Sequence, residues 1–311
     1  MATRDSEGNV TLTVCIPSSV VRETSSKREA THKLGRIARA AVVFRADRLV
    51  VFPDHTGERR WGEEFVATVL EYAATPPYLR TEIWGKRSEL EAVGVLPPLR
   101  VAGTGSGPER SESSREGIVT EVGSDGRVRV NCGLQHPISL VVPPDMEVGE
   151  GERVTVRLSS REPVRARIVA EPPPGFAVQR ADLASTLEAP DAGLRIGTSR
   201  HGTALSVARL DPLVERIAAD GATVAFGAPE RGLPAILGLP PETIAENAAG
   251  ETGTVGETEL ADTASKHDRT DTLGNRPGGF DRWLDSMPNQ GTATVRTEEA
   301  LFATLACCNL R

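Results

Sequence analysis

The residues best suited to chemistry gather near the end of the chain, in the stretch 285–301. This stretch contains Asp285, Arg296 and Glu298, and His201 lies in an earlier segment of small and polar residues. A carboxylate or an imidazole can accept a proton. A guanidinium carries a permanent charge and five N–H donors, so it can stabilise negative charge. These four side chains are therefore candidates for proton removal and charge stabilisation.

The same stretch predicts a polar turn that leads into a buried helix. Pro288, Asn289 and Gly291 disfavour a helix, whereas Ala, Leu and Phe recur with helical spacing from Glu298 onward. Thr297 is the predicted N-cap, because its hydroxyl can accept from the free N–H groups of the first turn. The small residues and backbone donors before it form a turn that can wrap a flat heteroaromatic ligand.

The first hundred residues predict an α/β fold. Strands are expected over 10–16 and 48–53, the second being a short apolar run suited to a buried parallel strand. Helices are expected over 27–45 and from about 62 to 74. The first helix has a basic side that either is simply solvated or contacts phosphate. Its basic residues are Lys27, Arg28, Lys33, Arg36 and Arg39.

Between residues 117 and 170 the pattern changes to five short β runs with turns, which predicts a small barrel. The Gly- and Ser-rich residues 100–114 before it are expected to be a linker. The barrel has few aromatic residues, so it is expected to bind RNA through phosphate and shape contacts, or to act only as a spacer. The arginines for such contacts are Arg127, Arg129, Arg157, Arg165 and Arg167.

After three prolines at 172–174 the α/β pattern resumes. Strands are expected at 194–199 and 222–227, and each ends in Gly or small polar residues, where a ligand can approach the backbone at the carboxyl edge of a sheet. Residues 241–279 are rich in Ala, Gly, Thr and Glu without periodicity and predict a disordered acidic insertion. The expected domains are 1–99 and 172–311, forming one α/β domain, with a barrel domain inserted at 100–171.

Composition limits the class of protein. The chain has 311 residues, with 39% hydrophobic and 25% charged residues, which fits a water-soluble globular protein. No apolar run approaches the roughly 20 residues of a membrane span, so a cytoplasmic location is expected. The net charge of −7 argues against a generally basic nucleic-acid binder, although arginines are concentrated locally. The four cysteines have no metal-ligand spacing, and no metal is expected.

Several motifs resemble those of a known family. Residues 290–300, Gln-Gly-x-x-x-Val-Arg-Thr-Glu-Glu-Ala, resemble the C-terminal motif of SPOUT (α/β-knot) RNA methyltransferases. Within that superfamily the whole chain resembles an archaeal and eukaryotic family described as RNA uridine-N3 methyltransferases. The other matching segments occur in family order at 14–19, 115–119, 130–133, 196–199 and 226–227.

The resemblance implies a trefoil knot, in which the loops 197–202, 227–232 and 285–296 converge. In SPOUT proteins these loops hold S-adenosylmethionine bent, beside a two-fold homodimer interface, and the family implies an OB-like fold for the barrel. The residues implied to line the cofactor are Thr198, His201, Gly202, Gly227, Asp285, Pro288, Gln290 and Val295. His201 stands where relatives commonly have Arg, and Asn289 stands where they often have Gly.

The implied reaction is methylation of an rRNA uridine at N3, with N1 and O2′ as alternative positions. It requires removal of the imide proton and stabilisation of charge on the flanking carbonyl oxygens. Arg296 is predicted to stabilise that charge and Glu298 to act as the base, with Asp285 and His201 as equal alternatives for the base. The alternative function is an RNA-binding or ribosome-assembly protein with little or no catalysis.

Overall fold

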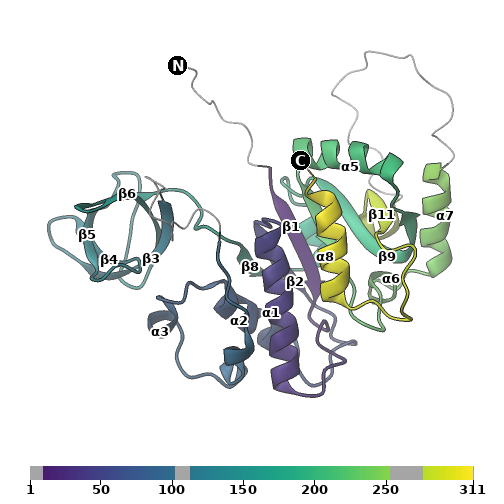
Figure 1. The fold of residues 1–311 in the computed structure, drawn as a ribbon, viewed down its shortest axis with the longest axis horizontal. Coiled ribbons are helices and arrows are strands. Elements are labelled where there is room, and N and C mark those ends of the chain that lie inside the picture. Colours follow the sequence, from purple (N-terminus) through teal and green to yellow (C-terminus); the bar gives the residue numbers. More distant parts are fainter. Residues whose placement is uncertain (1–9, 102–112, 253–275, 311) are drawn as a thin grey trace, which may run out of the picture.

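A computed structural model describes residues 10–101, 113–252 and 276–310 of the chain (Figure 1). These residues form a mixed α/β structure with one parallel and one antiparallel sheet. The parallel sheet has six strands in the order β11-β9-β10-β1-β2-β8. Its strands are β1 (Leu12–Pro17), β2 (Arg48–Phe52), β8 (Ala177–Arg180), β9 (Leu194–Ala204), β10 (Ala222–Ala225) and β11 (Arg282–Asp285).

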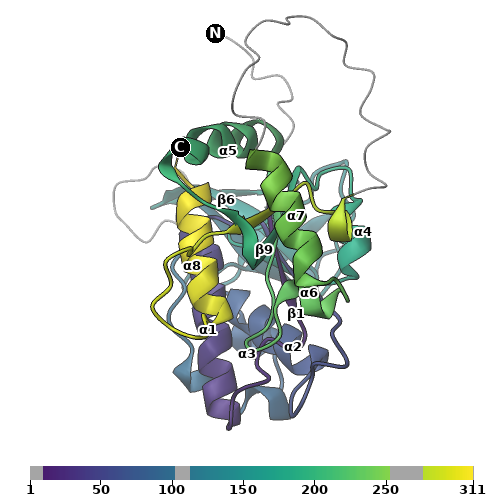
Figure 2. The ribbon, with the colours of Figure 1, turned by 90° about the vertical axis from the view of Figure 1, so that its right-hand side faces the viewer.

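Helices cover both faces of the parallel sheet, as Figure 2 shows. One face packs against α1 (Lys27–Val43), α2 (Glu63–Ala74), α5 (Val207–Asp220) and α8 (Thr297–Cys308). The other face packs against α4 (Leu183–Leu187), α6 (Leu233–Ile236) and α7 (Pro241–Thr252). Every residue of β1 and β10 is buried, which is why these strands read as continuous apolar runs rather than alternating ones.

The predicted strands and helices of the first hundred residues are confirmed within a few residues. One prediction about α1, the exposure of Lys33, is wrong. Lys33 does not lie on an exposed basic side, because its ammonium is buried and ion-paired with Glu23 and Glu298. The Lys33–Glu298 ion pair joins α1 to α8, and these two helices run side by side (Figure 1).

The antiparallel sheet has the order β5-β4-β3-β6-β7 and nearly closes, because β5 and β7 also lie next to each other. Its strands are β3 (Ser113–Val122), β4 (Arg127–Asn131), β5 (Ile138–Val141), β6 (Arg153–Arg161) and β7 (Val164–Val169). On β4, Val128 and Val130 point inward between outward arginines. The five expected short strands are therefore present, and β3 begins at Ser113, inside the expected linker. The rest of that linker, 102–112, lies outside the described residues.

The connection from α2 to the barrel has short helical turns: α3 (Arg80–Ile83), η1 (Ser88–Leu90) and η2 (Val93–Val95). Tyr78 ties this connection to the barrel, since its hydroxyl donates to the carbonyl of Glu116 over 2.8 Å. The barrel projects from the α/β part on the side of α2 and α3 (Figure 1).

The sequence prediction of disorder over 241–279 is wrong for its first part, because 241–252 form α7. Pro241 suits the first turn of a helix, Ala and Glu are strong helix formers, and Ile244 is fully buried against the second face of the sheet. Residues 277–279 form a short 3₁₀ turn, and 253–275 lie outside the described residues. The short strands β8 and β11 were also missed.

Candidate cofactor pocket and catalytic site

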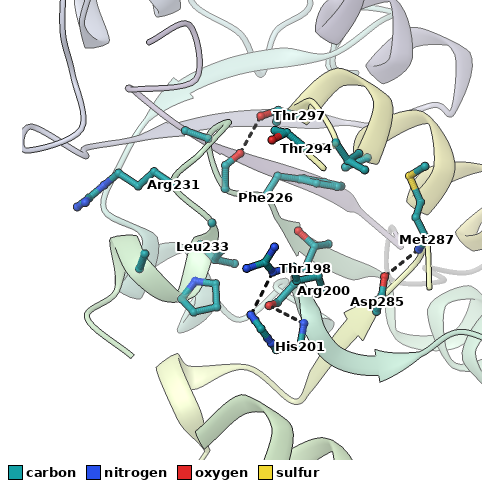
Figure 3. Close-up of a pocket in the computed structure, with 18 of the residues that line it drawn as sticks. Thr198, Arg200, His201, Phe226, Arg231, Leu233, Asp285, Met287, Thr294 and Thr297 are labelled. Atoms are coloured by element: carbon teal, nitrogen blue, oxygen red, sulfur yellow. Dashed lines mark hydrogen bonds between the residues drawn. The ribbon is translucent and has the colours of Figure 1, made fainter. Parts of the chain in front are cut away.

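A pocket of about 410 Å³ lies against the middle of β9 and beyond β10, beside the end of β11 (Figure 3). Three segments supply most of its lining: residues 198–201 within β9, most of 226–235 after β10, and parts of 284–300 from the end of β11 onward. Leu239 and Pro241 complete it. The three segments expected to converge do meet here, but the first of them, 197–202, belongs to strand β9 and is not a loop. The carboxyl edge of a parallel sheet is where ligands usually bind in α/β proteins.

Six of the ten predicted site residues line this pocket, namely Thr198, His201, Gly227, Asp285, Gln290 and Val295. The other four do not line it, namely Gly202, Pro288, Arg296 and Glu298. Pro288 is exposed on the turn that follows β11. Gly202 serves strand packing, because a Cβ there would lie 2.7 Å from the backbone carbonyl of Trp283.

Gly227 allows the second loop to fold back on itself. A Cβ at this position would lie 2.4 Å from the backbone nitrogen of Leu233 and 2.7 Å from the carbonyl carbon of Gly232. Real Cβ atoms do not approach other atoms so closely. Any larger residue would therefore open the loop that forms one wall of the pocket.

The prediction that Thr297 is the N-cap of α8 is wrong. Arg296 occupies the cap position with extended backbone, and its N–H donates to the carboxylate of Glu299 over 2.9 Å. Thr297 is instead the first helical residue, and its buried hydroxyl donates to the carbonyl of Gly227 over 2.8 Å (Figure 3). The helix is thereby fastened to the end of β10. The side chain of Arg296 is exposed, between two residues that line the pocket.

Glu298 faces α1, does not line the pocket and is 2% exposed. Its carboxylate oxygens lie 3.5 Å from Lys33 Nζ and 3.7 Å from Arg36 Nη1, both on α1. One carboxylate oxygen has no hydrogen-bond partner. This environment is that of a buried ion-pair group that joins two helices, and it does not favour the predicted role of base.

The titratable groups that do face the pocket are Asp285 and His201. Burial raises the pKa of the Asp285 carboxyl above its ordinary value of 3.8, although the Met287 N–H, which donates to Oδ1 over 3.0 Å, and nearby His201 oppose this. Arg200 Nε donates to His201 Nε2 over 3.2 Å, so a neutral His201 carries its proton on Nδ1. A carboxyl with a raised pKa in a cleft is a typical candidate for proton transfer.

Sequence reasoning missed the contribution of Arg231, which lines the pocket and anchors its second loop. Arg231 Nε donates to Asp54 Oδ2 over 3.0 Å, and Asp54, at the end of β2, also accepts from Ser19 after β1. Figure 3 shows the guanidinium directed away from Asp285 and His201. Its partner lies 177 positions away, so no local pattern could have signalled the pair.

The loop of Arg231 also holds a backbone outlier. Glu230 has φ 62°, which only Gly and a few other residues adopt readily. It lies in a tight turn closed by two backbone hydrogen bonds between Ala228 and Arg231. An outlier of this kind beside a pocket often accompanies a functional site.

On the barrel, three of the five arginines expected to contact phosphate have local partners. Arg127 donates to Ser139, Arg129 pairs with Glu121 and Arg157 pairs with Glu171. Arg165 and Arg167 of β7 are exposed, and no hydrogen bond or ion pair of their side chains is found among the described residues. These two are the barrel arginines best placed for an external ligand.

Among the described residues, no three or more His, Cys, Asp or Glu side chains are grouped closely enough to bind a metal ion. None of the helices in this part of the chain combines the length and the apolar character needed to cross a membrane.

The chain is similar in sequence to several known proteins. A family model described as "Putative RNA methyltransferase" matches residues 11–308. An uncharacterized protein of Halobacterium salinarum is 56% identical over 97% of this chain and 99% of its own length. The human 28S rRNA (uridine-N(3))-methyltransferase is 29% identical over 95% of this chain and 77% of its own length. The mouse protein of the same name is 28% identical over 98% and 78%, respectively.

Proposed function

The chain belongs to the RNA methyltransferase family whose model spans residues 11–308, and from this membership we propose that it transfers a methyl group from S-adenosylmethionine to N3 of an rRNA uridine. The observation that carries the proposal is the pocket in which the middle of β9 and the segments after β10 and β11 converge. The names of the human and mouse relatives supply the uridine-N3 specificity, and their coverage of nearly the whole chain supports carrying it over. A location in the cytoplasm, where ribosomes act, is part of the same proposal.

The pocket suits S-adenosylmethionine in size and character. Its volume falls within the usual range of roughly 300–1,000 Å³ for small-molecule sites. Leu239, Met287 and Val295 are partly exposed and provide apolar surface for an adenine ring, while Gln290 and backbone groups after β11 provide polar contacts. When bound, S-adenosylmethionine supplies an electrophilic methyl group on a sulfonium. Thr198 supports the wall through a hydrogen bond from its hydroxyl to the carbonyl of Ala225.

Removal of the imide proton falls to a residue that faces the pocket. Asp285 is the best placed, because its raised pKa makes its carboxylate a stronger base than an exposed one. His201 lies near enough to influence that carboxyl and can take over the proton or orient the base. Glu298 is not proposed for this role, because it is buried against α1.

Negative charge on the uracil oxygens requires a cation at the pocket. We assign the stabilisation of this charge to Arg296, because its side chain is exposed and the residue lies between the pocket residues Val295 and Thr297. Arg200 lines the pocket and is the second cation within reach. Both guanidiniums carry a fixed charge and several donors, which suits a delocalised anion.

The chain path supports the proposed knot. Residues 286–296 run from β11, at one edge of the sheet, to Gly227 at the end of β10, two strands inward. The proposed homodimer is supported by α8, which keeps apolar residues on its outer side. Ala306 is exposed there and Phe302 is half-buried, and Leu310, just after the helix, is also exposed. An Ala306→Arg variant should be monomeric by light scattering if this face joins two copies.

Two measurements test the proposal. Calorimetry should show S-adenosylmethionine binding at about micromolar dissociation constant, corresponding to about 8 kcal/mol. Mass spectrometry of rRNA nucleosides from cells with and without the gene should show loss of one N3-methyluridine. RNA binding without cofactor binding would favour a non-catalytic role in ribosome assembly.

The role of Arg296 is tested separately. Arg296→Ala should keep cofactor binding and lose about 10²–10³-fold in turnover, the usual loss for one charge-stabilising donor. Arg200→Ala tests whether Arg200 stabilises the charge instead. Arg216→Ala, on the exposed side of α5, is the matched control. Unchanged turnover in Arg296→Ala would remove this residue from the mechanism.

A further inference from the structure

Arginine side chains lie over aromatic rings at three places in the described part of the chain, and all three are between residues 60 and 87. The pairs are Arg60 with Trp61, Arg80 with Tyr72, and Arg87 with Trp84, at 5.5, 4.7 and 5.3 Å from guanidinium carbon to ring centroid. In contrast, residues 113–171, which form the barrel, contain no Phe, Tyr or Trp. Unpaired bases are held largely by stacking on aromatic rings, so the barrel lacks the groups for that contact.

Two of the three pairs border a second hollow, of about 720 Å³, between the end of α2 and residues 80–93. The rings of Tyr72 and Trp84 meet edge to face with centroids 6.0 Å apart. Both side chains are partly exposed. The hollow therefore presents aromatic surface to solvent at a place where the sequence contains few aromatic residues overall.

The rings are held in place by the backbone around Thr75. Trp84 Nε1 donates to Thr75 Oγ1 over 3.0 Å. Arg80 Nε donates to the carbonyl of Thr75 over 3.0 Å, which fixes the guanidinium that covers Tyr72. The aromatic surface is thus rigid before any ligand arrives, which lowers the entropic cost of binding.

Two cationic side chains border the hollow, Lys86 and Arg87. Both residues are exposed, and within the described residues neither side chain makes a hydrogen bond or an ion pair, although the Arg87 guanidinium lies over Trp84. The acidic residue in the lining, Glu91, is already paired with Lys27 at 2.8 Å. The hollow consequently combines aromatic faces with unpaired positive charge, which complements the bases and phosphates of a nucleic acid strand.

The hollow also lies between the barrel and the start of α1. On the barrel side, Asn131 Nδ2 donates to Glu82 over 2.6 Å. On the other side, Lys27 Nζ donates to the carbonyl of Ser88 over 2.8 Å. Hydrogen bonds from Ser25 lower the pKa of Glu29 in the first turn of α1, and the charge of Arg296, just before α8, lowers it further. The hollow is thus connected to the barrel on one side and to the start of α1 on the other.

We propose that the Tyr72–Trp84 hollow binds an unpaired stretch of the RNA substrate, with a base stacked on Trp84 and phosphates on Lys86 and Arg87. The barrel then contributes phosphate contacts alone. The proposal rests on RNA being the substrate, as stated above, but it does not depend on methyl transfer.

Tryptophan fluorescence tests it directly, since the protein has only three tryptophans and Trp84 is one of them. The probes are an oligouridylate of about ten nucleotides, its duplex with oligoadenylate, and an abasic ribose-phosphate strand of equal length, all added without cofactor. Oligouridylate should quench the emission, whereas the duplex and the abasic strand should bind at least about fivefold more weakly. Equal affinity for the abasic strand would overturn the proposal.

Variants separate stacking from charge. Trp84→Phe should lose the quenching and keep affinity within about threefold, whereas Trp84→Ala should lose about tenfold. Arg87→Ala and Lys86→Ala should each lower the dependence of log affinity on log salt by about 0.7. Both are exposed, so their folding is not in question. Arg216→Ala and Trp61→Phe are the controls and should bind as the wild type does.

The outcomes distinguish this proposal from the proposed function. If Trp84→Ala, Arg87→Ala and Lys86→Ala all bind oligouridylate like the wild type, the hollow is not an RNA site, even if methyl transfer is found. If the affinity for oligouridylate falls in these variants while the wild type shows no methyl transfer, the hollow is an RNA site but the proposed function is wrong. Displacement of the RNA by an equally charged polyglutamate at the same concentration would also overturn the proposed RNA site. Binding would then depend on negative charge alone and not on the bases.

Discussion

The hydroxyl of Thr297 donates a hydrogen bond to the carbonyl of Gly227 over 2.8 Å and so joins the first turn of α8 to the end of β10. Both residues line the candidate cofactor pocket. The bond closes the pocket on the side where the chain passes from the third loop into the last helix. It is a tertiary contact across 70 positions of sequence.

Thr297→Val keeps the shape of the side chain and removes this donor. We expect the free energy of unfolding to fall by about 1 kcal/mol and the affinity for S-adenosylmethionine to fall several-fold, because the Gly227 carbonyl loses its partner. Urea unfolding and calorimetry measure the two effects. Thr120→Val in the barrel, which also removes a hydroxyl that donates to a backbone carbonyl, should change stability alone.

Gly227→Ala should impair the pocket more severely, because the added Cβ would lie 2.4 Å from the backbone nitrogen of Leu233. We expect cofactor affinity to fall by at least about tenfold, a cost of 1.4 kcal/mol or more. Gly291→Ala is the matched control in the third loop, where a Cβ meets nothing within 4 Å. Equal affinities of the two variants would show that the second loop does not form the cofactor wall.

Asp285→Asn tests the proposed base through its pH dependence. Burial raises the pKa of Asp285 in the folded state above 3.8, so the folded protein holds this proton more tightly than the unfolded chain. Ionisation therefore costs stability as pH rises from the unfolded pKa to the folded one. Relative to Asp285→Asn, the wild type should lose stability across that window and no further above it, as urea titrations at several pH values would show.

The same substitution should affect catalysis in the opposite sense. Methyl transfer by the wild type should increase as pH rises through the raised pKa, because the ionised carboxylate is the active form. Asp285→Asn should lose about 10²–10⁴-fold in turnover and keep cofactor binding. Asp211→Asn, on the exposed side of α5, serves as the control. Full turnover in Asp285→Asn would move the role of base to His201.

Glu298→Gln separates a structural role from a catalytic one. Glu298 is buried beside Lys33 and Arg36, so we expect about 2 kcal/mol of lost stability, less than for a fully orphaned charge because Lys33 keeps Glu23. Turnover of the folded variant should stay within about threefold of the wild type. A loss of about 10²-fold or more would restore Glu298 as the base. Glu299→Gln, at the adjacent exposed position, is the control.

Local sequence patterns were sufficient for much of the fold and for the place of the pocket. The runs in β1 and β2 are apolar because both faces are covered, and Gly227 follows β10 where backbone must approach closely. Gly197 does not end its strand, since β9 continues to Ala204. The resemblance in 290–300 then indicated the third loop, and Asp285, Gln290 and Val295 do line the pocket.

The errors share one physical cause, which is contact between distant segments. Lys33 was expected on an exposed basic side and Glu298 at the catalytic site, but the packing of α1 on α8 buries them together. Helix α7 lacks a periodic apolar pattern in its sequence, yet Ile244 is fully buried in the apolar cluster on the second face of the parallel sheet. The Arg231–Asp54 pair likewise arises from the order of strands, which no local pattern encodes.

The placement of β11 at the edge of the sheet has a consequence for synthesis. The first two walls of the pocket come from residues 198–235, but the third comes from 284–300, after the rest of both sheets has been translated. A nascent chain that has left the ribosome only as far as Gly279 can assemble the barrel and most of the parallel sheet, yet it has no closed pocket. Closure of the pocket therefore waits for the synthesis of residues 284–300, after the other two walls have been made.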